Sequence, residues 1–210
     1  MKFIIERDIF NKIDNLYVGV VVAKGIDNSK TYPIINEMLK DSIMKAELNY
    51  LDVKVKEHES IIPYRDAFSK LRINPNKFQC SIEAMFNRIL KGKQLPYINP
   101  LVNLNNAISL KYTLPMGTHD LENVVEPIEM RCSVLGDTFK PMGTEKIELP
   151  DIGEVVYAIQ NNGRTRRWTW RQSDEGKITD KTNYVFFQSM DLRGLMTKML
   201  EMQLMNLKRR

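Results

Sequence analysis

The amino-acid sequence predicts an α+β fold. In the first half of the chain, apolar residues recur at helical spacing. In the second half, apolar and polar residues alternate in short segments, as they do in half-buried strands. One β-branched segment precedes the helices, and no Gly/Ser-rich linker separates the two halves. We therefore predict a single integrated domain over residues 1–210.

The first half contains one predicted strand and four predicted helices. The strand is LYVGVVVA (residues 16–23), a continuous apolar run of the kind that suits a strand covered on both faces. Helical spacing then recurs over about residues 34–46, 64–71, 81–90 and 100–108. Ser81 is the predicted N-cap of the third helix, and Asn99 followed by Pro100 predicts the start of the fourth.

The second half is predicted to be mainly strands. These are residues 128–134, EVVYAIQ (154–160), TRRWTW (165–170) and NYVFFQS (183–189), with Asn162-Gly163 as a hairpin turn. In TRRWTW, alternation would place Trp168 and Trp170 on one face. Asp191 is the predicted N-cap of a final helix that runs through Leu200 and ends in a basic segment.

Composition bounds the class of protein. The 210 residues are 43% hydrophobic and 27% charged, which is typical of globular proteins. No apolar run reaches about 18 residues, and the N-terminus MKFIIERDIF does not resemble a signal peptide, so we expect a cytoplasmic protein without a membrane partner. The net charge of +5 permits nucleic-acid binding without requiring it. Cys80 and Cys132 lack metal spacing, which indicates buried, reduced thiols.

Few residues of the chain suggest chemistry. We find no metal-binding, phosphate-loop or dinucleotide motif, and we expect no metal or cofactor. Of the two histidines, His119 lies in a predicted turn, PMGTHDLE, where loops often carry sites. The segment RRWTWRQS predicts either a core hairpin or the aromatic wall of a pocket with a polar edge.

Several segments in order resemble one family. They include YRDAFSKLRINPN, NPLVNLNNAISL, LPMGTHD, IEMRCSVLGDTFKPMG, GEVVYA and WRQSDEGKITDKT. Together they resemble the B3/B4 domain of the bacterial phenylalanyl-tRNA synthetase β subunit, and the chain looks like a free-standing member. The resemblance runs from about Tyr64 to Met190. It implies a mixed sheet flanked by helices and an editing activity that hydrolyses a wrongly attached amino acid from tRNA.

The resemblance also implies which positions matter. The family segment GQPLHAFD aligns with LPMGTHD, so that Asp120 matches the terminal Asp and Gly117 takes the place of the family's histidine. His119 stands two residues later. The family's Gly-Gly-Glu stretch aligns with residues 172–174, which makes Asp174 the counterpart of the glutamate that reads the tyrosine hydroxyl.

The resemblance supports a trans-acting aminoacyl-tRNA hydrolase as the leading hypothesis. It implies no ligase activity and two partners, the aminoacylated 3′ end of a tRNA and a small amino-acid ligand. The predicted catalytic residues are His119, Asp174 and Thr179; the predicted substrate-binding residues are Asn103, Trp168, Trp170, Arg171, Gln172 and Ser173; and the predicted RNA-binding residues are Arg65, Arg166 and Arg167.

Two other hypotheses remain open. One is a non-catalytic module that binds an amino acid, an aminoacyl group or RNA. The other is a structural partner of a translation protein, which docks through the methionines of the predicted C-terminal helix, Met196, Met199, Met202 and Met205.

Overall fold

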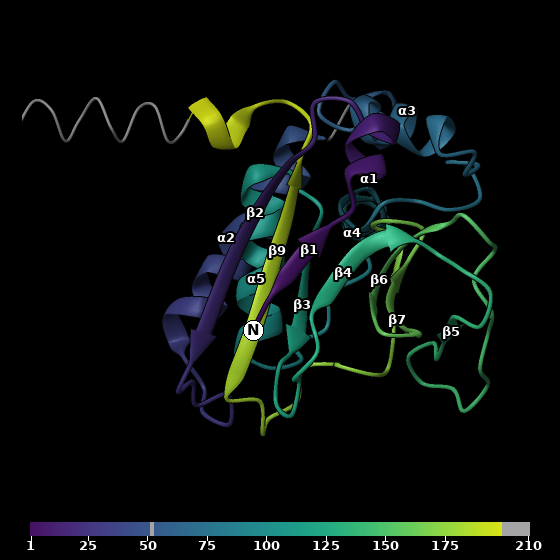
Figure 1. Ribbon diagram of the computed structural model, residues 1–210. Coiled ribbons are helices and arrows are strands. Elements are labelled where there is room, and N and C mark those ends of the chain that lie inside the picture. The colour runs from purple at the N-terminus through teal and green to yellow at the C-terminus, as the bar shows by residue number, and fades with distance from the viewer. Residues whose placement is uncertain (51–52, 199–210) are drawn as a thin grey trace, which may run out of the picture.

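The chain forms two β-sheets with helices around them (Figure 1). The computed structural model describes residues 1–50 and 53–198. The larger sheet is mixed, with the order β1-β4-β6-β7-β5 and β8 paired to β7, and the smaller sheet is antiparallel, with the order β2-β9-β3. This architecture confirms the predicted α+β class.

The elements have the following bounds. The strands are β1 (Phe3–Ile5), β2 (Tyr17–Lys24), β3 (Met116–Asp120), β4 (Ile128–Cys132), β5 (Thr138–Phe139), β6 (Val155–Ile159), β7 (Asn162–Arg166), β8 (Arg171–Gln172) and β9 (Tyr184–Asp191). The helices are α1 (Arg7–Lys12), α2 (Pro33–Asn49), the 3₁₀ turn η1 (Val55–Glu57), α3 (Ile62–Lys70), α4 (Ser81–Leu90) and α5 (Pro100–Tyr112).

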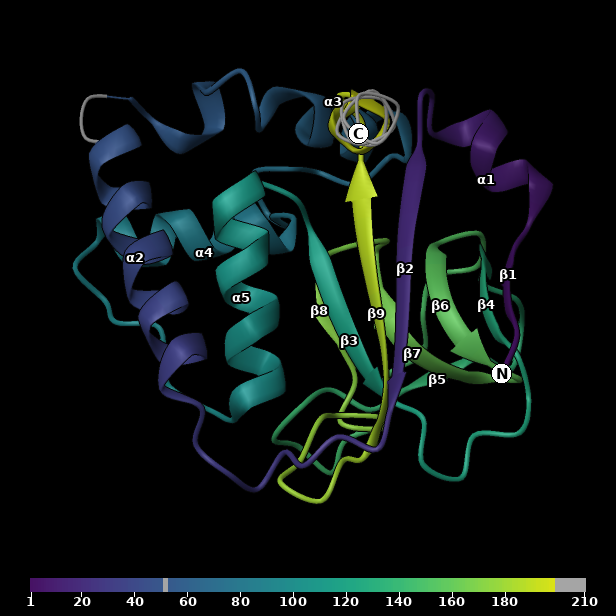
Figure 2. The ribbon, with the colours of Figure 1, turned by 90° about the vertical axis from the view of Figure 1, so that its left-hand side faces the viewer.

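The four predicted helices correspond to α2, α3, α4 and α5. Figure 2 shows α2 and α5 side by side on one side of the small sheet. Helix α5 starts as predicted, because the Asn99 side chain accepts a hydrogen bond from the backbone N–H of Val102 at 3.0 Å. Strand β1 and helix α1 were not predicted. None of the described helices is long and apolar enough to cross a lipid bilayer.

Strand β2 differs from its prediction in burial. In the described part of the chain it pairs only with β9, so it is an edge strand. Val20, Val21 and Val22 are 43%, 61% and 45% exposed. The prediction that this strand is covered on both faces was therefore wrong. An apolar run indicates extended structure, but it does not reveal whether the strand lies at the centre or the edge of a sheet.

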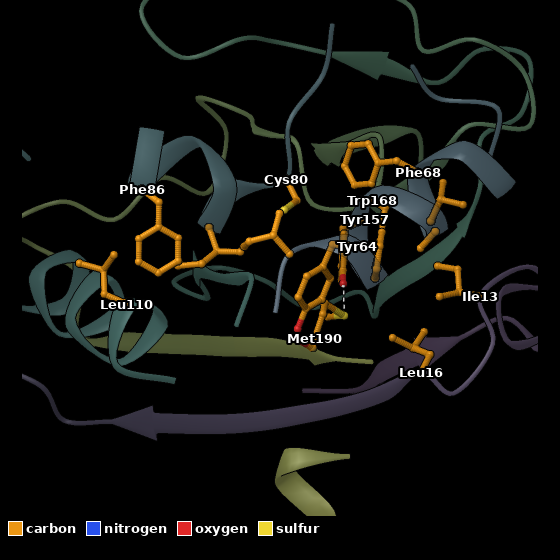
Figure 3. Packing of buried hydrophobic residues seen from close by; sticks show 14 of the residues in the cluster. Ile13, Leu16, Tyr64, Phe68, Cys80, Phe86, Leu110, Tyr157, Trp168 and Met190 are labelled. Atoms are coloured by element: carbon orange, nitrogen blue, oxygen red, sulfur yellow. Dashed lines mark hydrogen bonds between the residues drawn. The ribbon is translucent and has the colours of Figure 1, made fainter. Parts of the chain in front are cut away.

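One hydrophobic cluster joins the two sheets. Phe3 on β1 stacks on Tyr157 of β6 and packs at a tilt against Phe186 of β9, with ring centres 6.1 and 5.1 Å apart. Trp168 is fully buried, and it packs against Tyr64 at 6.3 Å between ring centres (Figure 3). The cluster thus connects the small sheet, the large sheet and helix α3.

The segment TRRWTW is not a strand, contrary to the prediction. Strand β7 ends at Arg166, residues 167–170 form a turn, and β8 returns so that Arg166 pairs with Arg171. The turn forms because it buries the whole of Trp168, and it requires positive φ angles of 46° at Arg167 and 60° at Trp168. The two tryptophans therefore do not share a strand face.

The β6–β7 turn also lies earlier than predicted. Ile159 pairs with Asn162, so residues 160–161 make the turn and Gly163 belongs to the strand. The glycine is needed for space, because a Cβ there would lie 2.9 Å from the carbonyl oxygen of Thr138 on the neighbouring strand β5.

The structure corrects three other local predictions. The segment predicted as a turn around His119 is strand β3. Cys80, not Ser81, is the N-cap of α4, which makes Ser81 the first helical residue. Asp191 ends β9, and its carboxylate accepts hydrogen bonds from the backbone N–H groups of Arg193 and Met196. Residues 195–198 are helical and form the start of the predicted final helix, whereas its continuation from Met199 onward lies outside the described residues.

Both cysteines are free thiols, as predicted. Cys80 is buried, and burial raises its pKa to about 12. Cys132 is only half-buried, so the prediction that it is buried was wrong.

Candidate functional site: a cavity beside the tryptophan turn

A cavity of about 80 Å³ lies where the turn 167–170 meets strands β3 and β9. The turn is held from two sides. The backbone N–H of Trp168 donates to Val155 on β6 at 2.7 Å, and the N–H of Ser81 at the start of α4 donates to the carbonyl of Thr169 at 2.9 Å. The cavity is lined by Ser81, Pro115, Met116, Gly117, Tyr157, Thr165, Trp168, Thr169, Trp170, Arg171, Gln172, Gln188 and Met190.

Several residues around this cavity carry a buried polar atom without a hydrogen-bond partner. In residues 1–50 and 53–198, nine buried side-chain nitrogen or oxygen atoms lack a hydrogen-bond partner. Four of the nine belong to residues that line the cavity: Ser81 Oγ, Thr169 Oγ1, Trp168 Nε1 and Gln188 Oε1. An unsatisfied buried polar atom costs about 1–3 kcal/mol, so a concentration of them indicates a place where a ligand or water makes the missing bonds.

Backbone geometry supports the same conclusion. Arg167 and Trp168 are consecutive non-glycine residues with positive φ. Such conformations cost about 1–3 kcal/mol each and cluster at binding and catalytic sites. Here they turn the Trp168 ring into the core beside the cavity while Thr169 stays next to Ser81.

The cavity has a positive electrostatic bias. Its lining includes one cation, Arg171, and no carboxylate. Arg171 is half-buried, its guanidinium lies 5.7 Å from the ring centre of Trp170, and no described carboxylate is within ion-pair distance of it. The positive end of the α4 dipole also begins at Ser81. The site therefore suits a ligand that presents a carbonyl or another oxygen acceptor.

His119 lies behind the cavity rather than in it. Its ring is buried between two amides: Gln172 Nε2 is 3.5 Å from its Nδ1, and Gln188 Nε2 is 3.2 Å from its Nε2. Burial, with a smaller contribution from the charge of Arg164, lowers the pKa of His119 to about 3. The imidazole is thus neutral near pH 7 and positions the two glutamines that line the cavity.

Gly117, which takes the place of the family's histidine, lines the cavity. A Cβ at this position would lie 2.5 Å from Gln188 Nε2. A side chain here would push the glutamine aside, so the glycine keeps room for the amide beside the cavity.

Four of the predicted substrate-binding residues line the cavity: Trp168, Trp170, Arg171 and Gln172. Two others are occupied elsewhere. Asn103 Oδ1 accepts from the backbone N–H of Ile98 at 3.2 Å, and Ser173 Oγ donates to the carbonyl of Lys140 at 2.9 Å. Both are buried and hold loops in place, so the structure does not bring them to the cavity.

The other two predicted catalytic residues also lie apart from it. Asp174 lines a separate surface hollow, where it forms an ion pair with Lys177 at 2.8 Å, and the hydrogen bond from Lys177 lowers the pKa of Asp174. Thr179 belongs to a turn in which its hydroxyl accepts from the N–H of Lys181 at 3.3 Å.

Two predicted RNA-binding arginines are engaged within the fold. Arg65 Nη1 lies 2.6 Å from Glu83 Oε1, and it ties α3 to the start of α4. Arg166 makes two hydrogen bonds to Glu154, at 3.0 and 2.8 Å, and a third to Glu148 at 2.7 Å. Both guanidiniums hold internal carboxylates and leave little surface for phosphate.

Arg167, the third predicted RNA-binding arginine, lies between the cavity and a larger groove. Its guanidinium carbon is 4.0 Å from the ring centre of Phe78 and 4.9 Å from that of Trp170. Phe78 lines a surface groove of about 1,100 Å³ and Trp170 lines the cavity. The groove also holds the cations Lys12, Lys70, Arg72 and Lys77 and the carboxylates Asp14, Asp151 and Glu154. Arg167 is ion-paired with Asp151 at 3.2 Å and with Glu154 at 3.7 Å.

Sequence reasoning missed Ser81, Thr169 and Gln188. Ser81 was interpreted as an N-cap, which accounted for its hydroxyl. The signal for Gln188 was present, because it is an uncharged polar residue directly after the apolar run Val185, Phe186 and Phe187, where its amide needs partners.

Comparisons with known proteins agree with the resemblance. The family model of the B3/4 domain matches residues 63–198, well over half of the chain. A solved N-terminal fragment of the phenylalanyl-tRNA synthetase beta-subunit from Pyrococcus horikoshii superposes with a TM-score of 0.47 and 10% sequence identity, over 91% of this chain and 43% of that fragment. This chain thus spans less than half of the fragment's length. No curated protein matches it in sequence.

Proposed function

The chain belongs to the B3/4 domain family, and from this membership and the cavity we propose that it hydrolyses an aminoacyl ester at the 3′ end of a tRNA. One observation carries the proposal: the lining of the cavity contains four residues with an unpartnered buried polar atom, one cation that has no ion-pair partner among the described residues, and no carboxylate. The cytoplasm, where charged tRNA occurs, is the proposed site of action.

Three unpartnered donors suit the reaction. Water adds to the ester carbonyl carbon, the carbonyl oxygen becomes an oxyanion, and the bond to the ribose oxygen then breaks to release the amino acid and the tRNA 3′-hydroxyl. The hydroxyls of Ser81 and Thr169 and the indole N–H of Trp168 have no partner in the fold and belong to lining residues, so they are the proposed donors to that oxyanion, and Arg171 supplies positive charge.

Proton transfer by a lining residue is not part of the proposal. His119 is buried behind the cavity with a pKa of about 3. The rate enhancement then depends on holding the ester beside a water and on stabilising the oxyanion.

The groove is the proposed path of the RNA. Lys12, Arg72 and Lys77 have no ion-pair partner among the described residues, and the half-buried Phe78 lines the groove beside Arg167. Cationic side chains beside aromatic rings are typical of single-stranded nucleic-acid sites. Because Arg167 and Trp170 connect the groove to the cavity, an RNA end in the groove can direct its aminoacyl group inward.

Removal of one donor tests the proposal. Ser81→Ala deletes a hydroxyl with no partner in the fold, so stability should stay the same or rise, while single-turnover deacylation of charged tRNA should fall at least tenfold. Ser69→Ala, which removes a hydroxyl from the exposed surface of α3, is the matched control. If the wild-type protein accelerates deacylation of no aminoacyl-tRNA, the hydrolase proposal is wrong.

A binding module without turnover is the second candidate, because the cavity lining contains no group that titrates near neutral pH. In that case Ser81→Ala weakens the binding of an aminoacyl ligand, and the wild-type protein leaves the ester intact.

A further inference from the structure

We infer that the outer edge of strand β2 pairs with β2 of a second copy of this chain, so that two small sheets join into one continuous sheet about a two-fold axis at Val21. This inference goes beyond the proposed function, because neither the cavity nor the groove contains a residue of β2.

Strand β2 is an unprotected edge of the small sheet. Within the described residues it pairs only with β9, and in Figure 1 it is the left-hand strand of that sheet. Helices α2 and α5 lie toward β3, at the other edge (Figure 2). Natural proteins protect such edges with prolines, bulges, inward-pointing charges or short strands. Strand β2 has eight residues, YVGVVVAK, without a proline, and its register with β9 is unbroken.

The hydrogen bonds of β9 show which residues of β2 face outward. In an antiparallel sheet, the N–H and C=O of one residue point to one neighbouring strand, and those of the next residue point to the other. On the β3 side, the carbonyl of Tyr184 accepts from the N–H of Leu121 at 2.9 Å. On the β2 side, the carbonyl of Asn183 accepts from the N–H of Ile26 at 3.0 Å. The odd-numbered residues of β9 therefore face β2, and the register pairs them with the odd-numbered residues of 17–23.

The even-numbered residues of β2 consequently direct their backbone N–H and C=O groups away from β9. These residues are Val18, Val20, Val22 and Lys24.

This set of residues is complementary to itself. A hydrogen-bonded pair in an antiparallel ladder joins two residues that face each other's strand. A two-fold axis at Val21 pairs Val20 with Val22 of the second copy and Val18 with its Lys24, so every outward-facing residue of β2 finds a partner. A shift of the register by two residues in either direction leaves Val18 or Lys24 opposite a position outside the strand.

The side chains suit the same register. Val21 is 61% exposed, and the axis places it opposite Val21 of the second copy in a non-hydrogen-bonded pair, where cross-strand side chains are closest. Val20 and Val22, which are also exposed, become cross-strand neighbours. Lys24 is the only charged residue of the strand, and the two copies of it lie at opposite ends of the new ladder, so like charges do not meet.

A second copy is therefore the partner that this edge specifies. Its strand has the matching hydrogen-bonding phase and matching apolar side chains, and two-fold symmetry is the commonest symmetry of protein oligomers.

A charge swap at the axis tests the inference. Sedimentation velocity of the full chain, without tRNA, should show a concentration-dependent dimer. Val21→Lys places two lysines opposite each other and should weaken self-association roughly tenfold or more, and Val21→Glu should do the same. An equimolar mixture of the two variants should restore the dimer, because lysine then meets glutamate across the axis. Val134→Lys, at a valine that is 51% exposed and follows β4 in the large sheet, is the matched control and should dimerise like the wild type.

Backbone pairing is tested by a second variant and a second measurement. Val20→Pro removes an outward-pointing N–H and leaves the bonds between β2 and β9 intact, so it should weaken the dimer without unfolding the chain. In wild-type protein, amide hydrogen exchange at Val20 and Val22 should slow as the concentration rises. The amides of Val21 and Ala23, which face β9, should be protected at every concentration.

Three results would overturn the inference: a wild-type protein that stays monomeric at every concentration, a dimer that Val21→Lys and Val20→Pro both leave intact, or a mixture of Val21→Lys and Val21→Glu that remains monomeric. Because these measurements use no tRNA, such a result would leave the hydrolase proposal standing.

Discussion

Acidification from pH 8 to pH 5 should destabilise the protein by about 2 kcal/mol through His119 alone. Burial lowers the pKa of the folded-state imidazole to about 3, whereas an unfolded histidine has a pKa of about 6.5. The unfolded chain therefore binds the proton more readily. The histidine's contribution to stability is complete above pH 6.5 and is lost progressively as the pH falls toward 3.

The magnitude follows from proton linkage. At pH 5 protonation favours the unfolded state by a factor of about 30, which corresponds to roughly 2 kcal/mol. The value depends little on the folded-state pKa as long as that pKa lies below about 4, because the folded-state imidazole then stays almost wholly neutral at pH 5.

Urea denaturation of the wild-type protein and His119→Gln at both pH values measures this effect. The variant keeps an uncharged polar group between Gln172 and Gln188 but cannot take up a proton. The other histidine, His58, is present in both proteins and cancels in the comparison. The wild-type free energy of unfolding should fall by about 2 kcal/mol more than that of the variant. Equal pH responses of the two proteins would refute a buried, neutral His119.

The neutral state of His119 also has a consequence for the pH dependence of deacylation. If the deacylation rate shows an inflection near pH 6.5 that disappears in His119→Gln, the imidazole acts as a base and the neutral, positioning role is wrong.

Three further predictions concern the fold and the groove. Asp137→Ala should cost about 3 kcal/mol in urea denaturation, because it removes the carboxylate bonded to the buried guanidinium of Arg131 at 2.7 and 2.8 Å and leaves only Glu129, at 3.5 Å, as a counter-ion; a loss below 1 kcal/mol would contradict this. Gly163→Ala should cost about 1–3 kcal/mol, seen as a lower Tm, since its Cβ meets the backbone of β5 at 2.9 Å; an unchanged Tm would show that β5 can shift freely. Replacing Lys12, Arg72 and Lys77 together by glutamine should reduce the slope of log affinity for tRNA against log salt by about 2–3, and an unchanged slope would place the RNA elsewhere.

The sequence predicted helices more reliably than strands near the site. Helices such as α2 and α5 were found because an amphipathic helix shows its pattern within a few turns. The segment 165–170 has an alternating pattern as well, yet it turns at Arg167, because burial of Trp168 against Tyr64 is more favourable than continued pairing. That contact joins residues about a hundred positions apart, so no local pattern announces it.

Part of the candidate site was also predictable. Trp168, Trp170, Arg171 and Gln172 form one short segment whose unusual composition drew attention to it, and all four line the cavity. Gln188 also lines the cavity, but it comes from β9, so the composition of the segment 168–172 could not indicate it.

Sequence composition does not reveal which arginines form ion pairs in the fold. Arg166 and Arg171 are equivalent in the sequence, five positions apart. Only the fold places Glu154 against Arg166 and leaves Arg171 beside Trp170 without a carboxylate. The same amino-acid type thus became a structural ion pair in one case and the cavity's free cation in the other.

The sequence by itself determined the fold class, the family resemblance and the segment that forms one wall of the cavity, because each depends on patterns within a short stretch of chain. Tertiary structure alone decided which polar atoms keep their hydrogen-bonding capacity for a ligand. The physical reason is that a buried group is satisfied or left free by whatever packs against it, and that neighbour can come from any part of the chain.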